Sequence, residues 1–439
     1  MQVVDLLLEP TWIVPIEPGD RALEGHAVVV DGGAIVDLLP AADAKARYAP
    51  REHVELPGHV VLPGFVNAHV HNPMTLLRGL ADDAPLATWL REHVWPVEAR
   101  WVGEEFVRDG AELAIVEMLR SGTTTCSELY FFPDVLAATY RAHGFRAVVG
   151  APILEFPTAW ARDADEYLAK ADALVGDADG LVGYALAPHA PYTVSDPTFE
   201  RVLELAEARD LLIHTHVHES SAEIDEELVA RGVRPFERLR RLGVVSSRLL
   251  AAHMTHLTPE EIELVAELGA TVVHCPESNM KLANGFCPVD RLLDAGARVI
   301  VGTDGPASNN DLDMLGELRT AALLVKGASR DATKLPAIRA LRMATIDAAR
   351  ALRLDHLVGS IEPGKRADLI AVDLSQPETS PVYDPISQLL YAAHRGLVRE
   401  AWIDGKRRLR AGVVEDVDLP GVLAKARAWR ERIAGGAGA

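Results

Sequence analysis

Eight short runs of apolar and β-branched residues recur between about residue 60 and residue 350, and helical segments separate them. A typical separating segment, DPTFERVLELAEARD at 196–210, carries apolar residues at helical spacing. Strands that alternate with helices in this way pack as parallel βα units. Eight units predict an α/β fold built on a TIM-type (β/α)8 barrel. The runs are 59–71, 122–130, 145–154, 181–191, 211–220, 248–257, 270–279 and 297–305.

The two ends of the chain also have β-like sequence. Residues 26–40, HAVVVDGGAIVDLLP, predict a hairpin that turns at Asp31, Gly32 and Gly33. After residue 360 the stretches KRADLIAVDL and REAWIDGKRRLRAG are again β-like. We expect the terminal segments to pair into one small β-sandwich. The predicted domains are a sandwich part at 1–60, the barrel at 61–360, a second sandwich part at 361–422, and a terminal helix with a tail at 423–439.

Charge and cysteine content narrow the function classes. The formal net charge of −20 argues against nucleic acid as a partner, because phosphate contacts need a basic surface. The three cysteines form no CxxC pair, which is typical of a reducing compartment. We expect a cytoplasmic protein, since the first residues lack a basic leader and no apolar run approaches the ~20 residues that span a membrane.

Side chains that can bind metal gather where the predicted strands end. In a TIM barrel the carboxyl ends of the strands converge on one face, and that face carries the chemistry. Most of the histidines of this chain lie at those ends. The residues concerned are His69, His71, His189, His214, His216, His218, Glu219, His253, His256, His274 and Asp304.

The spacing of His69 and His71 indicates that their side chains share one face, but it does not by itself identify them as metal ligands. Side chains two residues apart on a strand point to the same face, so both can reach one ion. Taken alone, the pair is a weak signal for a metal site, and incidental polar residues on a buried strand are the more ordinary interpretation. His214, His216 and His218 also share one face, and periodicity does not decide which of them is a ligand.

The other strand-end residues have ordinary alternatives as well. Along a regular strand Glu219 would point to the face opposite that of His216, so it reaches the site only if the strand ends at this residue and the chain turns inward. His253 and His256 differ in register, so one of them is expected to be structural. Asp304 alone would be a turn or helix-cap residue, and His274 alone a hydrogen-bonded interior residue.

Several competing motifs are incomplete. GSIEPGKR has the glycine and lysine spacing of a phosphate loop, but Arg366 stands where serine or threonine would hold magnesium, and a strand-like run follows. GxSxG and HExxH do not occur. The PCxxC half of the cytidine-deaminase zinc signature is also missing.

Read in order, the strand-end residues and their flanking sequences resemble the metal-dependent amidohydrolase superfamily. LPGFVNAHVH and GSIEPGKRADLIAVDL are typical of the start of its barrel and of the return to its sandwich. A closer resemblance is to the 5′-methylthioadenosine/S-adenosylhomocysteine deaminases, which are related to the triazine chlorohydrolases. That resemblance rests on LLRGLADD, VWPVEARW, APHAPYTVS, HVHES, HCPESNMKLANGFCPV and GTDGPASNNDLDM.

The resemblance implies a residue set. Its metal ligands fall on His69, His71, His216 and Asp304. Its catalytic positions fall on Glu219, His253 and Asp304. Its substrate-binding positions fall on Glu98, His189, Glu219 and Asp304. The arginine that members carry shortly after the third strand has no counterpart in VVGAPILEFP, so the preferred 5′-substituent stays open.

The implied cofactor is one Zn²⁺ per subunit, because three imidazoles and a carboxylate suit zinc and the fourth run has no lysine to bridge a second ion. The implied reaction is the attack of metal-bound hydroxide on C6 of an adenine nucleoside, with release of ammonia. In that reaction Glu219 shuttles protons, His253 stabilises the attacking oxygen and Asp304 accepts its proton. The expected substrate is 5′-methylthioadenosine, with S-adenosylhomocysteine and adenosine as further substrates.

Other readings remain open at this level. A triazine, halogenated-heterocycle or guanine-type hydrolase would use the same ions and ligands, and a non-catalytic metalloprotein could keep the same fold. Iron or manganese could replace zinc, and contacts of His256 and His274 with substrate are undecided. We expect a homo-oligomer from the resemblance. Trp89 and Trp95 could form the wall of an apolar pocket for a thioether group, but we expect them to be core or interface residues.

Overall fold

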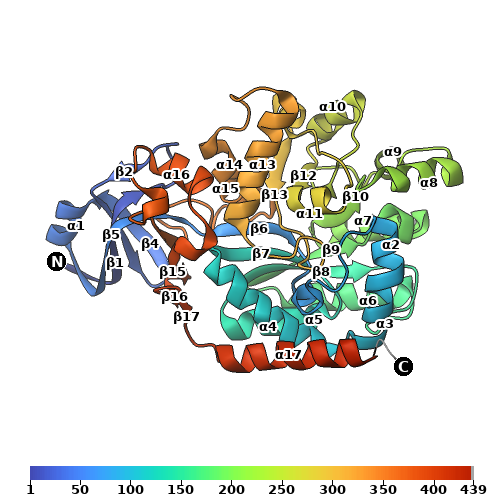
Figure 1. Ribbon diagram of the computed structural model, residues 1–439, viewed down its shortest axis with the longest axis horizontal. Coiled ribbons are helices and arrows are strands. Elements are labelled where there is room, and N and C mark those ends of the chain that lie inside the picture. Colours follow the sequence, from blue (N-terminus) through green and yellow to red (C-terminus); the bar gives the residue numbers. More distant parts are fainter. Residues whose placement is uncertain (437–439) are drawn as a thin grey trace. The chain divides into compact units, whose positions relative to one another are not determined.

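The eight predicted strands form one sheet of eight strands that follow one another in chain order (Figure 1). The structure is a computed structural model, and it describes residues 1–436. The pairs from β8 to β13 are parallel, as the alternation of strands and helices predicts. The predicted barrel is confirmed. The strands are β6 (Phe65–Val70), β7 (Thr123–Leu129), β8 (Arg146–Ile153), β9 (Val182–Pro188), β10 (Ile213–Val217), β11 (Leu249–His253), β12 (Thr271–His274) and β13 (Arg298–Val301).

The first predicted run differs from the other seven because it contains the end of one strand and the whole of the next. β5 (Tyr48–Pro63) belongs to a second sheet, and β6 begins two residues later. The backbone changes partners at Gly64, whose N–H donates to Asp368 O at 3.0 Å, while the next N–H, of Phe65, donates to Gly122 O at 2.9 Å. Proline and glycine at the junction make this change of direction possible.

The two ends of the barrel sheet meet at the predicted metal site. Asp304 N, three residues beyond β13, donates to His69 O of β6 at 2.9 Å. Gly302 lies so close to β6 that a Cβ atom there would stand 2.5 Å from His69 N. Only glycine permits this approach, so closure of the barrel depends on one missing side chain.

Capping residues mark where the covering helices begin and end. Ser195 caps α7 by accepting from Thr198 N, and a proline follows at the first turn. Thr258 and Glu261 form a capping box at the start of α10, which ends at Gly269 in the left-handed conformation. The segments between the barrel strands are η1 (Asn72–Leu77), α2 (Leu86–Thr88), η2 (Trp89–Val94), α3 (Trp95–Trp101), α4 (Glu104–Arg120), α5 (Pro133–His143), α6 (Ala164–Leu174), η3 (Val175–Asp177), η4 (Pro191–Thr193), α7 (Asp196–Ala208), α8 (Ser221–Arg231), α9 (Pro235–Arg241), α10 (Pro259–Leu268), α11 (Pro276–Lys281) and α12 (Val289–Asp294).

The terminal segments pair as predicted, and they form one mixed sheet. The hairpin at 26–40 is confirmed by the antiparallel pairing of β3 with β4, while β1 and β5 are parallel. Leu6 and Leu8 pack into one buried cluster and Leu7 into another, so both faces of the sheet are covered. The strands are β1 (Gln2–Ile13), β2 (Leu23–Glu24), β3 (His26–Asp31), β4 (Ala34–Pro40), β5, β14 (Leu369–Asp373), β15 (Val398–Ile403), β16 (Lys406–Arg410) and β17 (Val413–Val414).

The chain divides into two compact units whose limits differ from the predicted domains. One unit contains Met1–Asn67, Val116–Thr125 and Asp313–Val417, and the other contains Ala68–Ile115, Cys126–Leu312 and the chain from Asp418 onward. Residues 313–360, predicted as barrel, fall in the unit of the mixed sheet because their helices pack against α16 of that unit. The helices of this unit are α1 (Ala41–Arg47), α13 (Met314–Ser329), α14 (Ala337–Met343), α15 (Ile346–Ala351) and α16 (Pro385–Tyr391).

The predicted terminal helix is present as α17 (Leu419–Gly436). Its Trp429 is buried against Phe106 of α4, and the indole Nε1 donates to Asp109 at 2.9 Å. The end of the predicted tail, 437–439, lies outside the described residues. Within 1–436 no helix is both long enough and apolar enough to cross a membrane.

Gly302→Ala is expected to lower the free energy of unfolding by about 1–3 kcal/mol, because the added methyl overlaps the backbone of His69. Chemical denaturation measures the change. Gly183→Ala is the matched control, since Gly183 is a glycine of the barrel strand β9 at which a Cβ meets nothing within 4 Å. Equal stability of the two variants would contradict the close approach.

Candidate active site

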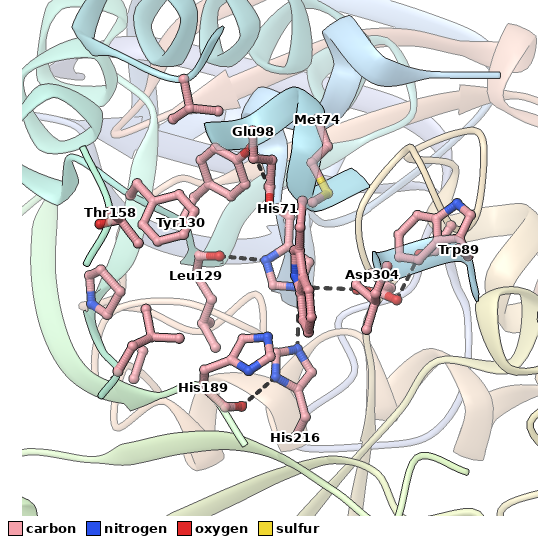
Figure 2. A pocket seen from close by; sticks show the side chains of 18 of the residues that line it. His71, Met74, Trp89, Glu98, Leu129, Tyr130, Thr158, His189, His216 and Asp304 are labelled. Atoms are coloured by element: carbon pink, nitrogen blue, oxygen red, sulfur yellow. Dashed lines mark hydrogen bonds and ion pairs between the residues drawn. The ribbon is translucent and has the colours of Figure 1, made fainter. Parts of the chain in front are cut away.

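Four side chains from three parts of the barrel converge at its carboxyl end. His69 lies on β6, His71 follows that strand, His216 lies on β10, and Asp304 follows β13. Asp304 Oδ1 is 3.2 Å from His71 Nε2 and 3.4 Å from His69 Nε2. His216 Nε2 is 3.3 Å from His71 Nε2 (Figure 2). The four residues that the resemblance names as ligands are therefore neighbours in space.

Backbone carbonyl groups fix the tautomers of two of these imidazoles. His71 Nδ1 donates to Leu129 O, and His216 Nδ1 donates to His189 O at 2.6 Å (Figure 2). A carbonyl can only accept, so each Nδ1 carries a proton and each neutral ring presents a lone pair at Nε2. Two lone pairs that face each other at 3.3 Å require a cation between them, either a proton or a metal ion.

The surroundings of His69 fit a metal ion. Its Nε2 is buried without a hydrogen-bond partner in the described part of the chain. Its Nδ1 is 3.0 Å from His214 Nε2, and His214 Nδ1 is 3.2 Å from Ser127 Oγ. Donor atoms about 2 Å from a tetrahedral ion lie about 3.3 Å from one another, which is the spacing seen here. Three imidazoles and one carboxylate are a donor set that zinc accepts.

Asp304 is held in place by two hydroxyl groups and by its backbone. Ser278 and Ser308 donate to Oδ2 at 2.7 and 2.8 Å, which leaves Oδ1 toward the histidines. The residue has φ of 62°, a left-handed conformation that costs a non-glycine residue about 1–3 kcal/mol. Burial alone would raise the Asp304 pKa, but the adjacent imidazoles of His69 and His71 hold it well below its usual range.

The pKa values of the clustered histidines also indicate that the site favours a positive charge. Burial lowers the pKa of His69 to about 4 and that of His216 well below its usual range. Burial would also lower the pKa of His71, but the Asp304 carboxylate raises it to about 9. A divalent ion in this position would supply the positive charge that otherwise falls on His71.

His253 and Glu219 lie beside this cluster. His253 Nδ1 donates to Asn279 Oδ1 at 2.8 Å, and its Nε2 is 3.9 Å from Glu219 Oε2. His69, His216 and His253 also form a group whose nitrogen atoms lie within 4.8 Å of one another, so geometry alone leaves His253 as a further potential ligand. Asn284 donates to Glu219 at 3.2 Å, and burial raises the Glu219 pKa.

The cluster opens into one cavity of about 430 Å³, a volume typical of small-molecule sites. His71, His216, Glu219, His253 and Asp304 line one part of it. Most of the remaining lining is apolar or aromatic, and it comprises Met74, Leu86, Trp89, Leu90, Trp95, Ala99, Val102, Leu129, Tyr130, Phe131, Pro152, Leu154, Phe156, Pro157, Ala159, Ala187, Tyr192 and Leu282.

Trp89 and Trp95 lie where the alternative to a core or interface position placed them, in the wall of an apolar pocket, and Trp89 is also buried. Both side chains line the cavity, Trp89 through a helix that the sequence indicates only weakly. Trp95 also packs on Phe156, with ring centroids 6.4 Å apart. Two tryptophans six residues apart have no regular helical spacing, and that irregularity hides their common role.

Glu98 and His189 both reach the cavity, where the resemblance places substrate contacts. Tyr130 donates to Glu98 Oε1 at 2.7 Å (Figure 2), and burial raises the Glu98 pKa to about 7. His189 Nδ1 is 3.0 Å from Thr193 Oγ1, and burial lowers its pKa to about 4. Tyr130 was not predicted as a site residue, although it follows the end of β7 and so stands at a strand end like the other site residues.

The remaining strand-end histidines do not line the cavity. His214 supports His69 from the interior, and His218 Nε2 accepts from Phe236 N at 3.1 Å. His256 Nε2 donates to Asn284 O at 2.6 Å, and His274 is fully buried in β12. Two serines and two asparagines that orient the site, Ser278, Ser308, Asn279 and Asn284, carry no signal of their own in a single sequence.

Comparison with known proteins identifies the family of this chain. The model of the amidohydrolase family matches residues 60–408. The chain belongs to this family and is a hydrolase. The match starts and ends in the mixed sheet and includes the whole barrel.

Relatives of known name cover nearly the full chain. A 5-methylthioadenosine/S-adenosylhomocysteine deaminase of Teredinibacter turnerae is 42% identical over 432 residues, 98% of each chain. The structure of an adenosine deaminase from Xanthomonas campestris with bound zinc is 54% identical, with a TM-score of 0.98 over 99% of each chain. The atrazine chlorohydrolase TrzN of Arthrobacter aurescens is 24% identical, with a TM-score of 0.90 over 97% of this chain and 99% of its own, and shares the fold. The predicted resemblance is confirmed.

His71→Ala is expected to abolish binding of a divalent metal, because it removes one of four converging donors. Metal content per chain, measured by mass spectrometry of the purified protein, tests this. His274→Ala is the matched control, since His274 is also a buried strand-end histidine but lies outside the cluster. Full metal occupancy in His71→Ala would refute the ligand assignment.

Proposed function

We propose that the protein hydrolytically deaminates adenine nucleosides, with 5′-methylthioadenosine as the preferred substrate. The observation that carries the proposal is a single cavity that joins a metal-binding cluster and a buried Glu219 to an apolar wall. The names of the relatives support the same reaction. In this reaction water adds at C6 of adenine, the bond from C6 to the amino nitrogen breaks, and ammonia leaves as a carbonyl forms.

His69, His71, His216 and Asp304 would hold one zinc ion. When bound, such an ion lowers the pKa of a water molecule to about 7 and so makes it a nucleophile near neutral pH. The chain itself holds the four donor groups close together before the reaction begins. The bonds at Nδ1 of His71 and His216, and the two serine hydroxyls on Asp304, preorganise the donors.

Glu219 and His253 would move and balance charge beside the purine. Burial raises the pKa of the Glu219 carboxyl group, which favours its protonated form. Glu219 would donate a proton to the ring nitrogen next to C6, and the resulting carboxylate would then take the proton of the hydroxyl group added at C6 and pass it to the departing amine. Asn284 holds that carboxyl by one oxygen. His253, oriented through Asn279, would donate from Nε2 to the oxygen that adds at C6, while Asp304 accepts the proton of the attacking water.

Glu98 and His189 would bind the ribose hydroxyls. Glu98 keeps one carboxyl oxygen for Tyr130 and can accept from a sugar hydroxyl with the other. His189 uses Nδ1 for Thr193, which leaves Nε2 for the substrate. Two fixed contacts of this kind hold a nucleoside in the orientation that the reaction needs.

The preference for an uncharged 5′-group follows from the lining of the cavity. Among the described residues that line it there is no lysine or arginine, while Glu98, Glu219 and Asp304 are acidic. A methylthio group loses little by leaving water for such a wall, whereas the charged amino acid group of S-adenosylhomocysteine loses its hydration without gaining a partner for its carboxylate. We expect adenosine to bind less well than the thioether because its 5′-hydroxyl is polar.

A substrate panel on zinc-loaded protein tests the proposal. We expect deamination in the order 5′-methylthioadenosine, adenosine, S-adenosylhomocysteine, measured by the loss of adenine absorbance. Guanine and cytosine, together with an assay for chloride release from a chlorinated triazine, are the negative controls. Release of chloride without any aminopurine deamination would replace the proposed reaction by dechlorination.

Glu219→Gln is expected to lower kcat for 5′-methylthioadenosine by about 10²–10⁴-fold with metal content unchanged, because the amide cannot shuttle a proton. Glu226→Gln, on the exposed face of α8, the helix that follows Glu219, is the control and should keep full activity. Turnover near the wild-type level in Glu219→Gln would exclude the proton-shuttle role.

A further inference from the structure

One helix carries much of the cavity wall, and it contains an unusual turn. α2, η2 and α3 follow one another without a break from Leu86 to Trp101, with αR backbone at each junction. Within this helix, Trp95 N–H donates to Leu90 O, five residues back, where an α-helix would bond four residues back. The η2 segment is therefore a π-helical turn, a feature that is frequent at functional sites.

Pro96 explains why the turn is wide. Proline has no N–H to donate, and in an α-helix its ring would collide with the carbonyl group four residues earlier, here that of Glu92. A wider turn moves that carbonyl away from the ring and closes the hydrogen bond one residue further back. The proline is exposed and does not line the cavity, so its effect is exerted through the backbone.

The turn brings two halves of the helix onto one face. Trp89 and Glu98 are nine residues apart, and in a regular α-helix that spacing would turn their side chains about 180° from each other. Both nevertheless line the same cavity (Figure 2). The π-helical turn accommodates one additional residue, which removes about 100° of rotation and so reduces the angle between the two side chains from about 180° to about 80°.

Contacts beyond the helix fix each half separately. Trp89 Nε1 donates to Ala81 O at 3.1 Å, which holds the indole of the first half. In the second half Glu98 accepts from Tyr130 at 2.7 Å, and Trp95 packs on Phe156. The first half also contributes Leu86 and Leu90 to the lining, so it supplies apolar surface while the second half supplies the carboxylate.

We propose that the π-helical turn, which Pro96 causes, determines substrate specificity. It does so by placing the Glu98 carboxylate and the apolar Trp89 side chain in the wall of the same cavity. It makes recognition of the ribose hydroxyls depend on the same helix that contacts the apolar part of the substrate. The chemical class so selected is a nucleoside with free ribose hydroxyls. The proposal rests on the proposed function, in which Glu98 binds the sugar.

The experiment changes the helical phase without touching a lining residue. Insertion of one alanine between Glu92 and His93 adds about 100° between Trp89 and Glu98 and places them on opposite faces. Deletion of His93 combined with Pro96→Ala removes the additional residue and the cause of the wide turn together. In a regular α-helix the remaining eight-residue spacing turns Glu98 only about 80° from Trp89, so the alignment is kept. Arg91, Glu92 and His93 are exposed.

The readout is the ratio of kcat/KM for adenosine to kcat/KM for 2′,3′-dideoxyadenosine on zinc-loaded protein. We expect the wild type to favour adenosine by at least about tenfold, since a site built to bond a hydroxyl rejects the analogue that lacks it. The insertion should bring the ratio close to one with metal content unchanged, and the deletion with Pro96→Ala should restore it. A general defect in folding would lower both rates and leave the ratio unchanged.

The possible outcomes separate this inference from the proposed function. A wild-type protein that deaminates neither nucleoside would overturn the proposed function. A wild type that deaminates both nucleosides equally, or an insertion variant that keeps the wild-type ratio at full metal content, would overturn the role of the turn while leaving deamination intact. Loss of discrimination in the deletion variant would equally contradict it, because that variant preserves the alignment.

Discussion

The structure of the site depends on one electrostatic constraint, the convergence of imidazole lone pairs at a largely buried barrel end. His71 and His216 donate from Nδ1 to backbone carbonyl groups, so the Nε2 lone pairs of both rings point toward the centre of the cluster. Burial makes it costly to protonate His69 and His216, and Asp304 adds a negative charge. A bound cation resolves all of these conflicts at once, whereas a proton on one ring resolves only part of them.

That constraint shapes the backbone that surrounds it. The barrel can close only where Gly302 allows β13 to approach His69, and the closing hydrogen bond comes from Asp304 itself. Asp304 and His253 both adopt left-handed backbone conformations, which persist because hydrogen bonds hold their side chains. Two residues to which the chemistry is assigned therefore carry backbone strain, although left-handed non-glycine residues also occur elsewhere in the described part of the chain.

The sequence predicts this fold well because its signals are periodic and local. Eight apolar runs and their helices specify the barrel, and parity explains why His69 and His71 act together. Parity could not choose between His214 and His216, because the difference is one of depth: His214 lies behind His69, and His216 faces the cavity. The start of β6 was missed for a similar reason, since the change of sheet at Gly64 interrupts no hydrophobic pattern. The limits of the compact units and the expected homo-oligomer depend on packing that no local pattern encodes, and the oligomer stays a prediction.

The cavity wall shows what periodicity hides when the helix itself is irregular. Trp89 and Glu98 have the spacing of opposite helix faces, so a regular helix would assign one of them to the protein core. The single proline that widens the turn reverses this conclusion, and it is visible in the sequence VWPVE. A proline inside an otherwise helical segment can therefore indicate a change in which residues share one face of the helix, as well as the end of the helix. Since the residues on either side of such a turn can meet around one ligand, the irregular turn is where a search for specificity in this barrel should begin.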